Sequence, residues 1–108
     1  MALAQQHESI YAAVGIHPHD AKMLDADALE ELKKLARSPK VVAVGEIGLD
    51  YYRDLSPRDV QRRAFKMQLE MAAELGLRAI VHDRDAHDDV LAILCEWHPL
   101  LVTRHSPP

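Results

Sequence analysis

The chain has 108 residues, of which 48% are hydrophobic and 28% are charged. This composition argues against a disordered chain and is typical of one globular domain with a single core. The formal net charge of −4 gives no general attraction to nucleic acid or acidic lipid. A phosphate-bearing substrate would therefore need local positive charge from a metal ion or from a few arginines.

Cysteine content and apolar runs limit the location of the protein. Cys95 is the single cysteine, which excludes an intrachain disulfide and zinc-finger spacing and favours a reducing, cytoplasmic location. Residues 1–8 have no basic region and no long apolar run, so we expect no signal peptide. No segment approaches the roughly 20 apolar residues of a membrane helix, so we expect no membrane partner.

Four short apolar runs along the chain are interpreted as buried parallel strands. They lie at residues 10–16, 41–46, 79–81 and 100–103. Three amphipathic helices are predicted between them, so the expected order is β-α-β-α-β-α-β. Alternation of this kind predicts an α/β fold with a parallel sheet and right-handed crossovers.

The three helices are predicted from apolar spacing and from their end signals. The first follows His17-Pro18-His19-Asp20 and ends at Ser38-Pro39. The second has Ser56 as the expected N-cap, and Gly76 ends it. The third has Asp85 as the expected N-cap, and His98-Pro99 is expected to end it. The inward stripes are Leu24, Ala28, Leu32 and Leu35; Val60, Ala64, Met67, Met71 and Leu75; and Ala86, Val90, Ile93 and Trp97.

A basic strip on the second helix has two interpretations. Arg58, Arg62, Arg63 and Lys66 form it. A nucleic-acid surface is one interpretation, and a solvated face is the one favoured by Glu70, Glu74 and the net negative charge.

Polar side chains follow each of the four predicted strands. They are His17 and His19, then Glu46, then His82, then His105. The carboxyl ends of parallel strands share one edge of a sheet, so these groups can converge there. Imidazoles and carboxylates are the ligands of hydrolytic metals such as zinc, manganese and magnesium, which lower the pKa of bound water.

Each of these residues also has a structural interpretation. Glu46 can cap a helix or pair with an arginine, and His82 can be a core histidine with satisfied hydrogen bonds. His17-Pro18-His19 can be a turn, and His105 can belong to a frayed tail.

Three spaced motifs together resemble the TatD family of metal-dependent deoxyribonucleases and related hydrolases. They are Val14-Gly15-Ile16-His17-Pro18-His19, Val44-Gly45-Glu46-Ile47-Gly48-Leu49-Asp50-Tyr51-Tyr52 and Val81-His82-Asp83-Arg84-Asp85-Ala86. Gln61, Phe65 and Gln68 also match the usual run of the family. The resemblance implies a (β/α)8 TIM-barrel-type fold, of which this chain would form about four strands with their helices.

The resemblance also implies a role for each matching residue. Glu46 would be the catalytic glutamate that bridges two divalent metal ions, with Mg, Mn or Zn as the expected metals. His82 and His105 would be further metal ligands. His17, His19 and Arg84 would contact substrate phosphate, a task for which the guanidinium fork of Arg84 is suited.

The same resemblance indicates which parts of a whole barrel this chain lacks. The family's first-strand His-x-His pair and its late aspartate have no counterpart here, so residues 1–108 are expected to form a single partial domain. Such a domain would lack the N-terminal strand and the C-terminal half of the barrel. A cut barrel exposes two sheet edges, so we expect marginal stability or self-association through those edges.

The expected function is divalent-metal-dependent hydrolysis of phosphodiester bonds, with DNA as the expected substrate. Exonuclease and endonuclease action, 3'-5' action included, are not distinguished by the sequence. Two alternatives remain at this point. One is hydrolysis of another ester or amide bond, and the other is an inactive fragment with a structural or partner-binding role.

Overall fold

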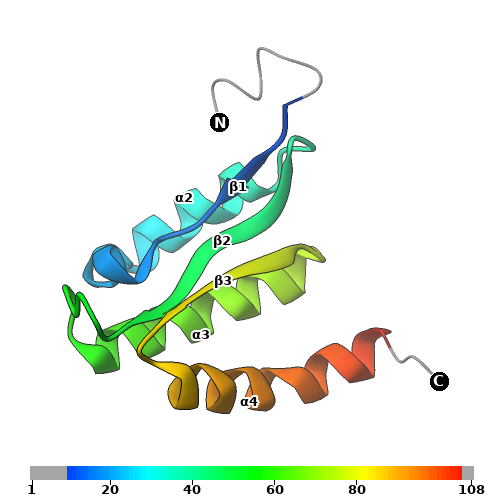
Figure 1. The fold of residues 1–108 in the computed structure, drawn as a ribbon. Helices are drawn as coiled ribbons and strands as arrows, with labels where there is room; N and C mark the ends of the chain where they lie inside the picture. The colour runs from blue at the N-terminus through cyan, green and yellow to red at the C-terminus, as the bar shows by residue number, and fades with distance from the viewer. Residues whose placement is uncertain (1–9, 106–108) are drawn as a thin grey trace.

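The protein alternates strands with helices along its whole described length. The structure, a computed structural model, describes the backbone of residues 10–105 and the side chains of residues 10–97. Figure 1 shows the arrangement. The elements in chain order are β1 (Ala12–Val14), the 3-10 helix η1 (Pro18–Met23), α2 (Ala26–Ala36), β2 (Val41–Asp50), α3 (Arg58–Leu75), β3 (Arg78–Arg84) and α4 (His87–His105).

The sheet has three parallel strands in the order β1-β2-β3. This confirms the predicted α/β class with a parallel sheet. Within the described residues β2 is central, and β1 and β3 are edge strands, each paired only with β2. Self-association through these edges stays a prediction.

The predicted fourth strand is wrong. Residues 100–103 belong to α4, which continues through His98-Pro99 as far as His105. A short apolar run such as Leu100-Leu101-Val102 has the composition of a buried strand and equally of a buried helix turn, and periodicity cannot separate the two. His105 therefore ends a helix and does not follow a strand.

Helix packing confirms most of the predicted inward stripes. Leu24, Leu32, Ala64, Met71, Ala86, Val90 and Ile93 are buried, and Ala28, Val60, Met67, Leu75 and Trp97 pack partly buried against them. Leu35 is the exception, since 43% of it is exposed. Gly76 ends α3 in the left-handed conformation, as predicted.

The predicted N-caps Ser56 and Asp85 are wrong, because neither residue occupies the N-cap position of its helix. Pro57 occupies the N-cap position of α3, while the buried Ser56 hydroxyl donates to the backbone carbonyl of His19 at 2.9 Å. Asp85 lies two residues before α4, and the backbone N–H of Ala86 is bound by Asp83 instead. Ser56 thus ties the start of α3 to η1.

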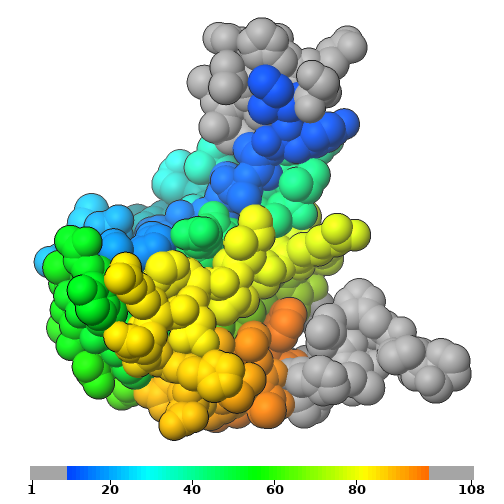
Figure 2. Space-filling model, viewed as in Figure 1, coloured from blue at the N-terminus to red at the C-terminus, as the bar shows by residue number. Residues whose placement is uncertain are grey.

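The helices and the free face of the sheet lie on opposite sides. In Figure 1, α2 and α3 lie behind the strands, against which the core forms. Figure 2 shows the other face, where β3 (yellow) is at the surface. Val42, Ile80 and Val81 are exposed. Within the described part of the chain, no helix is long and apolar enough to cross a membrane.

Gly48 sets the close approach of β2 to β3. It pairs with His82 in the sheet register and has φ = 141°, which side chains rarely adopt. A Cβ at this position would collide with the carbonyl oxygen of His82. The glycine is therefore required where β2 passes His82.

We expect Gly48→Ala to lower the free energy of unfolding by about 3 kcal/mol, because it combines a strained φ with a backbone collision. Urea denaturation followed by circular dichroism measures this. Gly76→Ala is the matched control: Gly76 also has positive φ (67°), but a Cβ there would meet nothing within 4 Å. We expect it to cost only about 1 kcal/mol, and equal costs for the two variants would contradict this account.

Candidate functional site

Glu46 projects from an irregularity in the central strand. Gly45 pairs with Ile80 and Ile47 with Val81, so Glu46 is an extra residue on β2 with no partner in β3. An extra residue of this kind bends the strand and redirects its side chain. The neighbouring core residues Val44 and Ile47 are fully buried, whereas 56% of the Glu46 side chain is exposed.

Gln68 of α3 fixes the backbone of Ile16, which comes directly before His17. The N–H of Ile16 donates to Oε1 of Gln68 at 2.7 Å, and Nε2 of Gln68 donates to the carbonyl of Ile16 at 3.1 Å. The side chain thus pairs with the backbone as a neighbouring strand would. His17 and His19 follow directly, and the backbone N–H of His19 donates to Nδ1 of His17 at 3.1 Å.

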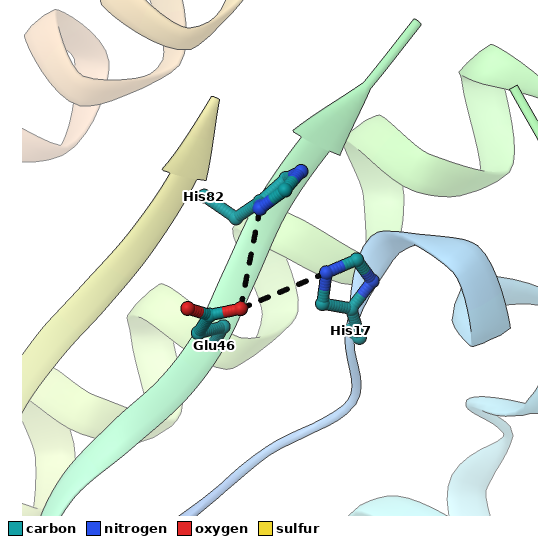
Figure 3. A group of neighbouring side chains, drawn as sticks. All are labelled: His17, Glu46 and His82. Atoms are coloured by element: carbon teal, nitrogen blue, oxygen red, sulfur yellow. Dashed lines mark ion pairs between the residues drawn. The ribbon is translucent and has the colours of Figure 1, made fainter. Parts of the chain in front are cut away.

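Three predicted site residues from different segments converge. Figure 3 shows Glu46 on β2 between His82 from β3 and His17 from the loop after β1. Oε1 of Glu46 lies 3.7 Å from Nε2 of His17 and 4.0 Å from Nδ1 of His82. The imidazole centroids of His17 and His82 are 4.6 Å apart.

Within this group, Glu46 and His82 fit a divalent cation by distance and by chemistry. One nitrogen or oxygen atom from each of the three residues lies within 4.8 Å of the other two. Ligands about 2.1 Å from one cation are at most about 4.2 Å apart, and the 4.0 Å between Oε1 of Glu46 and Nδ1 of His82 is shorter than that. Imidazole and carboxylate together suit zinc and manganese.

Asp50, at the end of β2, is a buried carboxylate beneath this group. Its Oδ2 lies 2.9 Å from Nε2 of His19 and 3.0 Å from Nε2 of His82. Its Oδ1 accepts the backbone N–H of Arg53 at 2.8 Å. Burial alone raises the pKa of Asp50, but the Arg53 N–H and the two imidazoles outweigh it and hold the pKa of the carboxyl well below its usual range.

The hydrogen bonds give His17 and His82 different available atoms. Nδ1 of His17 accepts the N–H of His19, so the neutral ring carries its proton on Nε2, which faces Glu46. Burial, and then the nearby rings of His19 and His82, lower the pKa of His17 and favour that neutral form. His17 therefore presents an N–H, whereas His82 presents Nδ1 to Glu46 on the side away from Asp50.

Of the other predicted site residues, His19 lies beside this group, with its ring centroid 4.1 Å from that of His17. His19 turns its Nε2 to Asp50. The guanidinium of Arg84 stacks over the ring of Tyr52, 4.0 Å from its centroid, and both side chains are exposed. His105 is the last residue of α4, and its side chain lies outside the described residues.

Sequence reasoning gave no role to Asp50, Gln61 or Gln68. The two glutamines lie two helical turns apart on α3 and are almost fully buried. Oε1 of Gln61 accepts the backbone N–H of Asp50 at 2.8 Å, as Gln68 does for Ile16. Glutamines on the apolar side of an amphipathic helix are the signal that would have found them, because buried amides require partners.

Comparison with known proteins gives one consistent family. The family model described as TatD related DNase matches residues 1–106. The chain is 45% identical over 96 residues to "Uncharacterized metal-dependent hydrolase YabD" of Bacillus subtilis, and these residues are 89% of this chain and 38% of the relative. It is 41% identical over 97 residues to "3'-5' ssDNA/RNA exonuclease TatD" of Enterobacter lignolyticus, covering 90% of this chain and 37% of the relative.

A solved structure has the same fold. The chain superposes on YJJV, a TatD homolog from Escherichia coli, with a TM-score of 0.80 and 37% identity, covering 89% of this chain and 38% of the other. This confirms the predicted fold class, part of a barrel of the TIM type. The chain spans less than two fifths of the length of each of these relatives.

We expect Gln68→Leu to destabilise the chain by about 2 kcal/mol, because the N–H and carbonyl of Ile16 lose their partner. Chemical denaturation measures this loss. Glu70→Leu, an exposed change on the same helix, should stay within about 0.5 kcal/mol of the wild type. A loss in Gln68→Leu no larger than in Glu70→Leu would show that Gln68 does not hold this segment.

Proposed function

The chain belongs to the family of TatD-related DNases, as its three spaced motifs indicated, and from this premise we propose that its function is divalent-metal-dependent hydrolysis of phosphodiester bonds in DNA. The observation that supports the proposal most directly is the convergence of His17, Glu46 and His82 from three separate segments. A relative of this chain is named as a 3'-5' exonuclease on single-stranded DNA and RNA.

Glu46 and His82 are the proposed metal ligands. Glu46 is exposed on the free face of the sheet, so both of its oxygens can be reached by cations. That accessibility suits a carboxylate that bridges two ions. His82 would bind through Nδ1, the nitrogen that faces Glu46. Further ligands of a two-ion site would come from outside the described side chains, and His105 is the candidate that the sequence offers.

His17 and Arg84 are assigned to the substrate, and His19 is assigned to the support of His17. His17 donates from Nε2 toward the space beside Glu46 and would bind a phosphate oxygen there. Arg84 follows His82 by two residues on β3 and would bind a second phosphate oxygen through its fork. His19 is bound to Asp50 and would support His17 through its backbone N–H. Bound divalent ions would supply the Lewis acidity and the lowered water pKa that the hydrolysis needs.

We expect this chain to cleave a fluorescent single-stranded oligodeoxynucleotide in the presence of Mn²⁺ and to lose the activity in EDTA. Glu46→Ala should lower the rate at least about 100-fold, because it removes the carboxylate that holds the charge at the reacting centre. Glu70→Ala is the control and should leave the rate unchanged. Glu70 is an exposed glutamate on α3 and lies outside the three motifs.

Other outcomes of the same assay would overturn the proposal. Unchanged cleavage by Glu46→Ala would show that Glu46 is not part of the reaction. No cleavage by the folded chain, or hydrolysis of carboxylic ester or amide substrates in place of the oligonucleotide, would show that the phosphodiester assignment is wrong for this chain.

A further inference from the structure

Asp50 is the buried acid of the site, and it lacks a cationic neighbour of fixed charge. Only 1% of it is exposed. Among the described side chains, those within ion-pair distance of it are His19 and His82, and no lysine or arginine is. A carboxylate is costly to bury unless hydrogen bonds replace its water. Its two oxygens accept three hydrogen bonds here, so the position is built for an acceptor.

The direction of these hydrogen bonds determines where the imidazole protons are. An ionised carboxylate only accepts, so the rings of His19 and His82 must each donate from Nε2. A neutral imidazole with its proton on Nε2 has its lone pair on Nδ1. In His82, Nδ1 is the atom 4.0 Å from Oε1 of Glu46. Asp50 therefore determines which atom His82 offers beside Glu46.

The backbone holds Asp50 rigidly enough for this task. Gln61 binds both its N–H, at 2.8 Å, and its carbonyl, at 3.3 Å. Oδ1 accepts the N–H of Arg53, so the rings of His19 and His82 both contact Oδ2. The carboxylate plane is thereby fixed, and both rings are oriented by a single oxygen atom.

We propose that Asp50 is a positioning residue that holds His82 in the Nε2–H tautomer and so directs the Nδ1 lone pair toward the cation site beside Glu46. Oδ2 of Asp50 also holds His19 in the Nε2–H tautomer. The inference rests on the proposed function for the cation site, but the tautomer itself is a property of the metal-free chain. A carboxylate behind a ligating histidine raises the basicity of the ligand and fixes its orientation.

The direct test is the tautomer of each histidine in the metal-free chain, measured at alkaline pH by long-range 1H–15N correlation of the imidazole rings. We expect His19 and His82 of the wild type to be Nε2–H. In Asp50→Asn, the amide oxygen keeps the Arg53 N–H and the amide NH2 faces the rings. Both rings must then accept at Nε2, and we expect His82 to become Nδ1–H.

Zn²⁺ affinity supplies the second readout, measured by isothermal titration. Asp50→Asn should bind Zn²⁺ about 10- to 100-fold more weakly than the wild type, because Nδ1 of His82 is protonated in this variant. Asp83→Asn is the matched control, since it removes the carboxylate of a separate pair, Asp83 and His87. It should leave the tautomer of His82 and the Zn²⁺ affinity unchanged.

These results separate the inference from the proposed function. Glu46→Ala should lose Zn²⁺ affinity and keep the wild-type tautomers, and failure to cleave DNA would leave the tautomers unaffected. An Nδ1–H tautomer of His82 in the wild type would overturn the inference, even if Asp50→Asn failed to fold. A folded Asp50→Asn with the wild-type tautomer and affinity would overturn it as well.

Discussion

The buried carboxylate of Asp50 is the constraint on which the site depends. A buried acid without a lysine or arginine partner must be satisfied by hydrogen-bond donors, and here two of its three donors are imidazoles from different elements, His19 of η1 and His82 of β3. Helix η1 and the end of β3 are thus joined through one oxygen atom of Asp50. The hydrogen bond from Nε2 of His82 to Asp50 also leaves Nδ1 of His82 facing Glu46. The hydrogen bonds that satisfy the buried carboxylate therefore also position the atoms that can bind a cation.

Helix α3 sets the distance between the end of β2 and the loop after β1. Gln61 binds the backbone of Asp50 and Gln68 binds the backbone of Ile16, two helical turns apart. These buried amides complete hydrogen bonds that the strands leave open at their carboxyl ends. Ser56, just before α3, adds a bond to the carbonyl of His19. The extra residue at Glu46 then lifts the acid onto the free face while its neighbours in β2 keep their pairing. A rigid helix and a locally irregular strand therefore place flexible side chains accurately.

The sequence predicted the general architecture and the convergence of His17, Glu46 and His82, because parallel strands end at one edge and each of these residues follows an apolar run. It could not predict that Asp50 is the partner of His82, since Asp83 and Asp85 are at least as near a predicted strand end and only the fold selects among them. The contact of Gln68 with Ile16 spans 52 residues and leaves no local pattern. Residues 100–103 were mistaken for a strand because short apolar runs do not reveal their period.

In the proposed site, Glu46 and Nδ1 of His82 bind the same cation while Nε2 of His82 stays bound to Asp50. A crystal structure of this chain soaked in Mn²⁺, with anomalous diffraction data, tests it most directly. We expect an anomalous peak within about 2.3 Å of a Glu46 oxygen and of Nδ1 of His82, with Nε2 of His82 still bound to Asp50. A peak coordinated by Nε2 of His82, or Mn²⁺ bound elsewhere with no peak beside Glu46, would contradict it.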